Sequence, residues 1–176
     1  MHRKTLPILC FVLLLAGCSR PPPAAVAAAS PQEASARAAA IEAAASRLTS
    51  VVGHRDGPGG DATWRAFFDG SELTLLEESV ADAPRPPLEN RYYFDKGALF
   101  YFAGQQAAEP GGGAEGVAPR IPVVAEFRGL QATRAVRIEH YGPVPLAAER
   151  AQGIARRAAE LAAAARDERS AQRVAP

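Results

Sequence analysis

Cysteine and lysine are scarce in this sequence, and these shortages limit how the chain can be stabilised. Its two cysteines are Cys10 and Cys18, so no disulfide can form within the part of the chain that follows Cys18. Lys96 is the one lysine after Lys4, and the other basic residues of that stretch are arginines. The apolar stretch from Leu6 to Ala16 is shorter than the about 20 residues that a membrane-spanning helix needs. A disulfide scaffold is therefore excluded, and a domain of this length can bury its own core without one.

Motifs for several common chemistries are absent as well. There is no G-x-S-x-G sequence of the kind that presents a nucleophilic serine. The glycine run from Gly111 to Gly113 is followed by neither a lysine nor a helix start, so it does not fit a phosphate-binding loop. The 20 basic residues fall to 18 without Arg3 and Lys4, against 19 acidic residues, and this balance gives no field that favours nucleic acid. We therefore expect no cofactor and no nucleic-acid partner.

The two histidines in the body of the chain, His54 and His140, assign no site. His54 precedes Asp56 and Asp61 in a glycine-rich stretch, which offers an imidazole and two carboxylates to a metal. Metal sites usually have tighter ligand spacing and a second ligand cluster, so we interpret this stretch as a solvated turn. His140 follows Glu139 on a predicted strand, where neighbouring side chains point to opposite faces and cannot form an acid and base pair. We assign no metal ligand and no catalytic residue.

The amino-terminal residues carry the most specific motif of the sequence. A short basic start, His2 to Lys4, is followed by the apolar stretch. The stretch ends in Leu15-Ala16-Gly17-Cys18, with small residues directly before the cysteine. This arrangement resembles the lipobox signal peptide of bacterial lipoproteins. The resemblance implies that residues 1–17 are removed and that Cys18 is the lipid attachment site.

The same resemblance implies an address in the cell envelope. Each buried acyl methylene contributes about 0.8 kcal/mol of membrane affinity, so the acyl chains typical of this class hold the protein at the membrane. Ser19 follows the cysteine, and under the enterobacterial sorting rule a residue other than Asp here directs a lipoprotein to the outer membrane, facing the periplasm. Residues 18–30 are rich in proline and alanine and are predicted to be a tether between lipid and domain.

A single α+β domain is predicted over residues 31–169. Ser30, Pro31 and Glu33 are typical of a helix start with a capping box. All aromatic residues except Phe11 lie between residues 64 and 141, which marks the sheet. The expected order is helix 31–52, sheet 63–141, helix 145–169 and a polar tail at 170–176. The charged residues of the second helix that we expect to lie towards solvent are Glu149, Arg150, Arg156, Arg157 and Glu160.

Three predicted hairpins make up the sheet. Asp69-Gly70 and Asp95-Lys96-Gly97 separate apolar runs in the way that tight hairpin turns do, and a fainter turn lies near Gly129. Short links favour antiparallel pairing, because parallel strands need crossover connections. We therefore expect an antiparallel β meander of about six strands, with both helices packed on one face.

Large aromatic residues gather in the second hairpin, in Tyr92-Tyr93-Phe94 and Phe100-Tyr101-Phe102. Because side chains alternate along a strand, both faces of this hairpin carry apolar surface. With both helices on one face, the other face is left to bind a partner; the alternative is that both faces are core. We assign the partner-binding surface to Arg91, Tyr93, Phe100 and Phe102.

These patterns favour a non-catalytic function. The chain is interpreted as a lipid-anchored envelope lipoprotein whose domain binds an envelope protein or a cell-wall polymer. One alternative is an envelope hydrolase acting on cell-wall glycan or lipid, with Glu77, Glu78 or His140 brought together by the fold. Another is a structural subunit of an envelope assembly that docks through its helices.

Overall fold

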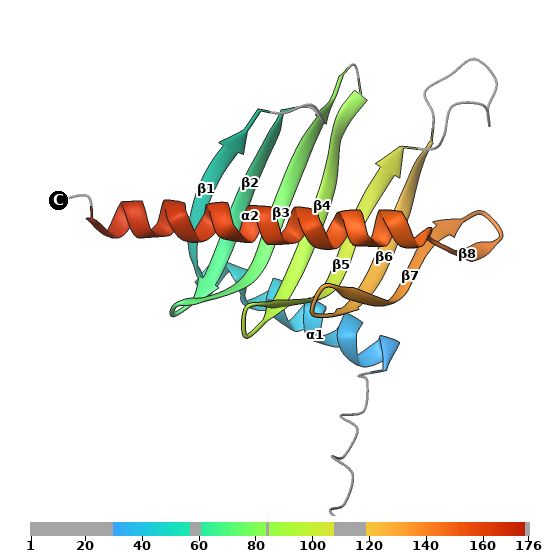
Figure 1. Ribbon diagram of the computed structural model, residues 1–176, viewed down its shortest axis with the longest axis horizontal. Coiled ribbons are helices and arrows are strands. Elements are labelled where there is room, and N and C mark those ends of the chain that lie inside the picture. The colour runs from blue at the N-terminus through green and yellow to red at the C-terminus, as the bar shows by residue number, and fades with distance from the viewer. Residues whose placement is uncertain (1–29, 57–60, 84, 108–118, 175–176) are drawn as a thin grey trace, which may run out of the picture.

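A helix, eight strands and a second helix follow one another along the chain (Figure 1). The computed structural model describes residues 30–56, 61–83, 85–107 and 119–174. The predicted leader, Cys18 and the tether up to residue 29 lie outside these residues. The elements are α1 (Pro31–Ala44), β1 (Thr49–Arg55), β2 (Ala62–Asp69), β3 (Glu72–Asp82), β4 (Arg85–Asp95), β5 (Ala98–Ala107), β6 (Arg120–Arg128), β7 (Gln131–Glu139), β8 (Gly142–Pro145) and α2 (Ala148–Val174).

The strands form one antiparallel meander, in which each strand pairs with its neighbours in the chain. This confirms the predicted α+β class. The six expected strands correspond to β2 to β7, and the sheet gains β1 and β8 at its two edges. The turn between β4 and β5 shows why sequence signals worked here, because Lys96 and Gly97 both have positive φ, as a tight two-residue hairpin turn requires.

The first helix is shorter than predicted. Its capping box is confirmed, since the Glu33 amide donates to the Ser30 hydroxyl at 3.3 Å and the Ser30 amide donates to the Glu33 carboxylate at 2.6 Å. The helix ends at Ala44 and one turn of 3₁₀ helix follows, so the expected continuation to residue 52 is wrong. Residues 49–55 pair with β2 instead, because Thr49, Val51 and Val52 are β-branched and suit a strand with a partner beside it.

The second helix is shifted towards the carboxyl end. Pro145 pairs with Val136 as the last residue of β8, so α2 begins at Ala148 rather than at residue 145. It continues to Val174, through most of the expected polar tail. Alanine, arginine and glutamine are good helix formers, which explains why the polar composition of this segment does not end the helix.

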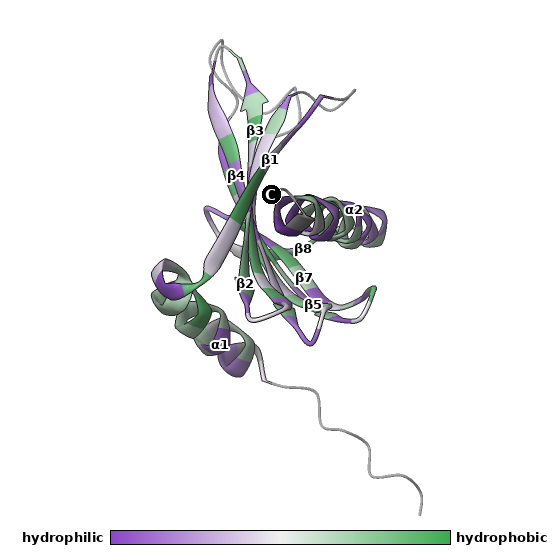
Figure 2. Ribbon diagram, turned by 90° about the vertical axis from the view of Figure 1, so that its left-hand side faces the viewer, coloured by the Kyte–Doolittle hydropathy of each residue, from purple (hydrophilic) through white to green (hydrophobic). Residues whose placement is uncertain are grey.

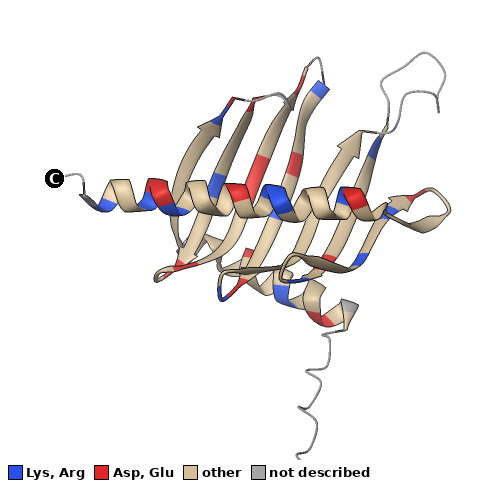
Figure 3. Cartoon of the chain, viewed as in Figure 1, with Lys and Arg blue, Asp and Glu red and all other residues tan. Residues whose placement is uncertain are grey.

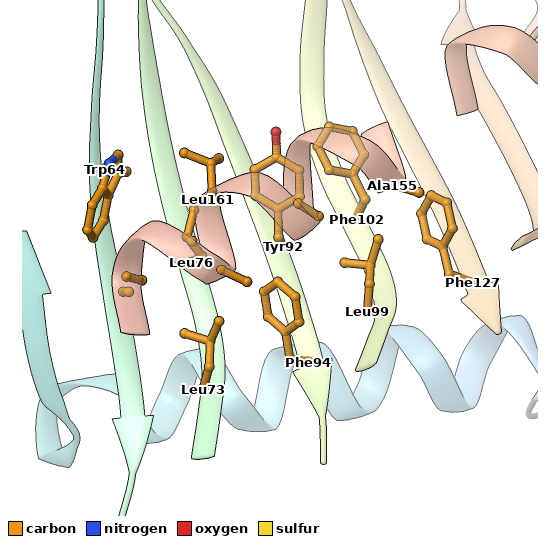
Figure 4. Packing of buried hydrophobic residues seen from close by; sticks show 14 of the residues in the cluster. Trp64, Leu73, Leu76, Tyr92, Phe94, Leu99, Phe102, Phe127, Ala155 and Leu161 are labelled. Atoms are coloured by element: carbon orange, nitrogen blue, oxygen red, sulfur yellow. The ribbon is translucent and has the colours of Figure 1, made fainter. Parts of the chain in front are cut away.

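The two helices cover opposite faces of the sheet, and the expectation of one shared face is wrong (Figure 2). On one face, α2 packs an alanine-rich stripe, with Ala158 and Ala165 almost fully buried, over large side chains of the strands. Figure 4 shows these side chains beneath the helix, including Trp64, Phe94 and Phe102. Small residues let the helix lie close to the sheet, and the aromatic rings fill the space between strands.

The other face carries a smaller core under α1. Ala34 and Ala38 of the helix lie over Phe67, Leu75 and Tyr93 of the strands. Because a helix occupies each face, the sheet becomes the middle layer of a three-layer arrangement. The aromatic residues on both of its faces are therefore used as core.

Candidate functional site

A cleft of about 490 Å³ lies between the first half of α2 and one end of the central strands, the end at which β3 and β5 finish and β4 and β6 begin. This volume is within the about 300–1,000 Å³ that ligand pockets commonly have. Apolar side chains form much of its wall, among them Val80, Phe102 and Ile154. Charged and amide side chains from four strands and the helix complete the lining. Such a mixture of an apolar wall and a few convergent polar groups is typical of a binding site.

The pairing of β3 with β4 brings the polar side chains of the cleft together. Glu78 of β3 pairs with Asn90 of β4, and Leu76 pairs with Tyr92. Residues two positions apart on a strand share a face, so Asn90 and Tyr92 both lie beside Glu78 on the face that α2 covers. Figure 4 shows the Tyr92 ring within the apolar cluster, with its hydroxyl at the edge of that cluster. The hydroxyl donates to the Glu78 carboxylate at 2.7 Å.

A glycine makes room for this arrangement. A Cβ at Gly104 of β5 would lie 2.3 Å from Asn90 Oδ1 and 2.5 Å from Cζ of Phe102. Real Cβ atoms do not approach other atoms so closely, and only the absence of a side chain lets both groups occupy this space. Gly104 therefore sets the positions of two residues that line the cleft.

Glu78 is the most deeply buried charged residue in the described part of the chain, with 1 % of its surface exposed. One carboxylate oxygen accepts from Arg157 Nε at 2.8 Å and also from Arg157 Nη2. The other accepts from Tyr92 at 2.7 Å and from Asn90 Nδ2 at 3.3 Å. Both oxygens are thus engaged by protein donors, which is what a buried carboxylate requires.

Burial shifts the titration of this cluster. Removal from water raises the pKa of Glu78, and this effect outweighs the hydrogen bonds from Tyr92 and Asn90 and the charge of Arg55, which lower it. The pKa of the Tyr92 hydroxyl is raised well above its ordinary value by burial and by the neighbouring carboxylate. Tyr92 therefore stays protonated and acts as a donor to Glu78.

Arginines dominate the charge of the cleft. Arg55, Arg150, Arg156 and Arg157 line it together with the carboxylates of Glu78 and Glu160, four positive charges against two negative ones. Glu160 accepts from Arg55 Nη1 at 2.9 Å and lies 3.9 Å from Arg157 Nη1. Basic and acidic residues interleave along α2 (Figure 3), and this helix supplies three of the four arginines of the cleft.

Three of the four residues assigned to partner binding contact α1 instead. Arg91 Nη1 donates to Glu42 of α1 at 3.3 Å, and the Tyr93 hydroxyl donates to the same carboxylate. The guanidinium of Arg37 lies 4.6 Å from the centre of the Phe100 ring. The face that we expected to be open is therefore covered by the protein's own first helix.

Phe102, the fourth assigned residue, lies on the other face, in the wall of the cleft. Tyr93 and Phe102 are 1 % and 4 % exposed, so their assignment to an exposed surface is wrong. A register shift in the pairing of β4 with β5 also changes the strict alternation, because Tyr93 pairs with Tyr101 whereas Phe94 pairs with Leu99. The extra residue of this bulge, Phe100, packs on the α1 side beside Tyr93.

The residues of the predicted hydrolase alternative are not brought together. Glu77 lies on the α1 side, where Arg91 Nε is 3.6 Å from its carboxylate. His140 lies in the turn after β7, not on a strand, and its ring packs against exposed Tyr141. Of the three residues named for that reading, only Glu78 lines the cleft.

The histidine near the end of β1 has a simple local contact. His54 Nε2 lies 2.6 Å from the Asp56 carboxylate, and both side chains are largely exposed. Among the described residues, no group of three or more His, Cys, Asp or Glu side chains could hold a metal ion.

Comparisons with family models, with curated proteins and with solved structures find no match to this chain. Neither of the two described helices is both long and apolar enough to cross a bilayer.

Sequence reasoning missed the helix side of the cleft. Arg157 was expected in solvent, but its side chain is only 25 % exposed and reaches Glu78 across 79 positions of sequence. A signal was present, because Arg157 follows Ile154 by three positions and precedes Leu161 by four and so lies on the buried stripe of the helix. An arginine within an apolar stripe predicts a buried acidic partner, although it does not identify that partner.

Proposed function

We propose that this protein is a lipid-anchored protein of the cell envelope that binds its ligand without catalysis, in the cleft between α2 and strands β3 to β6. The single observation that carries the proposal is the state of Glu78. Its carboxylate is buried, and each oxygen already accepts from side-chain donors. A general acid or nucleophile must reach its substrate, whereas a carboxylate held in this way orients the arginine beside it.

The cleft replaces the aromatic face as the binding surface in this proposal. Covering of the aromatic residues by α1 removes the large open apolar surface on which a flat protein contact was based. The cleft offers volume, apolar wall and donors at one place. These properties suit a small ligand, or a protruding group of an envelope polymer or protein, better than a flat protein surface.

The anchor remains a proposal based on the lipobox resemblance, because Cys18 precedes the described residues. We propose an outer-membrane location facing the periplasm, with the acyl chains on Cys18 as the membrane contact. The test is fractionation of cells that carry the parent protein or the Cys18→Ala variant. The parent should stay with the membrane after a high-salt wash and the variant should not. Equal retention of both would refute acylation at this residue as the anchor.

The binding function is tested by cross-linking in cells from two sites on the same helix. A photo-cross-linking amino acid replaces Arg150, which lines the cleft, or Arg166, which is exposed and outside the lining. We expect an adduct from position 150 that is absent from position 166. Adducts of the same mass from both positions, or from neither, would contradict binding at the cleft.

A hydrolase is the second candidate function, and one observation favours it. Glu78 and Glu160 line the same cleft, with Arg157 between their carboxylates. Most glycoside hydrolases use two carboxyl groups in one pocket as their catalytic residues. Incubation with purified cell-wall glycan or phospholipid tests this candidate. Turnover that is lost in both Glu78→Gln and Glu160→Gln would replace the binding proposal, and the absence of turnover would agree with it.

A further inference from the structure

The hydrogen bonds of Arg157 indicate the chemical class of the ligand. Arg157 uses Nε and Nη2 for Glu78. Its Nη1 has the Glu160 carboxylate at 3.9 Å, which is beyond hydrogen-bond distance. Arg55 holds Glu160 by a 2.9 Å bond. Nη1 of Arg157 therefore keeps donor capacity within the cleft, on a guanidinium whose orientation Glu78 fixes.

Two more arginines of α2 line the same cleft. Arg150 and Arg156 are exposed residues of α2 that contribute to its lining, and Arg150 Nη1 also donates to Gln106 of β5 at 3.1 Å. Both carboxylates of the cleft are already paired with arginine. A cationic ligand would meet a net positive charge, whereas an anionic group can accept charge-assisted hydrogen bonds from guanidinium groups.

The remaining wall of the cleft is apolar. It includes Phe102 of β5 and Val123 of β6, together with Leu146, which precedes α2, and Ile154, which lies within α2. An inorganic anion or a hydrophilic sugar would leave this wall without a complementary surface. An alkyl or similar apolar body would bury it, at about 25 cal/mol for each Å² removed from water.

From these observations we infer that the cleft binds an amphiphile with one anionic head group, which Arg157 receives with the help of Arg150 and Arg156. The apolar body of the ligand lies along the wall formed by Phe102, Val123 and Ile154. This inference rests on the proposed binding function of the cleft and adds the chemistry of the ligand. In this inference Arg150, Arg156 and Arg157 contact the ligand, and Glu78 positions Arg157.

Three probes with the same eight-carbon chain separate the contributions of head and chain. The full lipoprotein is placed in nanodiscs of neutral phosphatidylcholine and labelled by octanoate that carries a diazirine, and the labelled peptides are identified by mass spectrometry. Octanoate, octylammonium and octyl glucoside then compete for labelling. We expect label on peptides that contain Phe102 or Ile154, and we expect octanoate to compete at least about tenfold better than the other two.

Variants of α2 provide the matched controls. Arg156→Gln should weaken octanoate competition about tenfold, and Arg166→Gln, on the same helix outside the cleft, should leave it unchanged. Gly153→Leu should abolish labelling, because a Cβ at Gly153 meets no atom closer than 3.9 Å and a larger side chain can enter the cleft. Retained helical circular dichroism shows that this variant is folded.

The possible outcomes show whether the anionic head group is wrong or whether the binding function of the cleft is wrong. Equal competition by octyl glucoside and octanoate, with labelling still lost in Gly153→Leu, would overturn the anionic head group and leave a binding cleft. Labelling that lies elsewhere in the chain and persists in Gly153→Leu would overturn both proposals. The inference is supported if octanoate competes at least about tenfold better than the other two probes, and if this competition is weakened about tenfold in Arg156→Gln and unchanged in Arg166→Gln.

Discussion

The ion pair between Glu78 and Arg157 makes a prediction about stability that depends on which partner is removed. Glu78 is 1 % exposed, whereas the Arg157 side chain is 25 % exposed. Replacing Arg157 with Met leaves a buried carboxylate without its countercharge, and losses of this kind cost about 3–5 kcal/mol. Replacing Glu78 with Gln leaves an arginine that can still reach water, so we expect a smaller loss of about 1–2 kcal/mol.

The loss in Arg157→Met should also depend on pH. Without the guanidinium, Glu78 can stay buried by binding a proton, which costs about 1.4 kcal/mol for each pH unit above its ordinary pKa of 4.5. This cost is about 0.7 kcal/mol at pH 5 and about 4.8 kcal/mol at pH 8. Because burial raises the folded-state pKa of Glu78, the neutral form stabilises the fold fully below pH 4.5, and that contribution is lost as the pH rises through the raised value. Arg157→Met should therefore be destabilised by about 1 kcal/mol or less at pH 5 and by about 3 kcal/mol or more at pH 8, relative to the parent protein at the same pH.

Urea denaturation followed by the fluorescence of the single tryptophan, Trp64, measures these free energies of unfolding, since this residue is 5 % exposed in the folded protein. Arg156→Met is the matched control, because Arg156 is exposed on the same helix and its loss should change stability by less than about 0.5 kcal/mol. In the Arg157→Met background, Glu78→Gln should restore about 1 kcal/mol or more at pH 8, because a neutral amide needs no countercharge. Additive losses in the double variant, or an Arg157→Met loss that is the same at pH 5 and pH 8, would refute the reasoning.

Three further predictions concern packing, and thermal or urea denaturation checks each of them. Gly53→Ala should cost about 2 kcal/mol or more, because its Cβ would lie 2.0 Å from the Trp64 ring. Gly153→Ala in α2 should instead gain about 0.5–1 kcal/mol, because its Cβ would meet no atom closer than 3.9 Å; equal effects would contradict the close approach at Gly53. Ala158→Leu should cost about 1–3 kcal/mol because it would force α2 away from the sheet, and exposed Ala159→Leu should be nearly neutral; a neutral Ala158→Leu would show that the helix packs loosely. Phe102→Ala should lower the free energy of unfolding by about 3–5 kcal/mol, because the side chain is buried. A loss below about 1 kcal/mol would show that Phe102 is exposed.

Local signals in the sequence determined much of the meander. Capping residues at Ser30 and Glu33, the turn at Lys96-Gly97 and the apolar runs of β2 to β7 each act over a few residues, so each can be recognised without knowledge of the rest of the chain. The predicted helix boundaries were wrong where pairing with a strand farther along the chain decides the secondary structure. Val52 follows Leu48 by four positions, as on one face of a helix, yet pairing with β2 makes it a strand residue.

The candidate site shows the same division. The sequence by itself determined that aromatic residues occupy both faces of a hairpin. The spacing of Arg157 from Ile154 and Leu161 was also a signal for the apolar stripe of a helix, although we predicted this arginine to lie towards solvent. Only the tertiary structure decided that α1 and α2 take opposite faces, which buries Tyr93 and places Phe102 in the cleft wall. It also decided that Arg157 meets Glu78, because periodicity specifies which side of an element is apolar, whereas the neighbour across that side depends on how the chain returns in space.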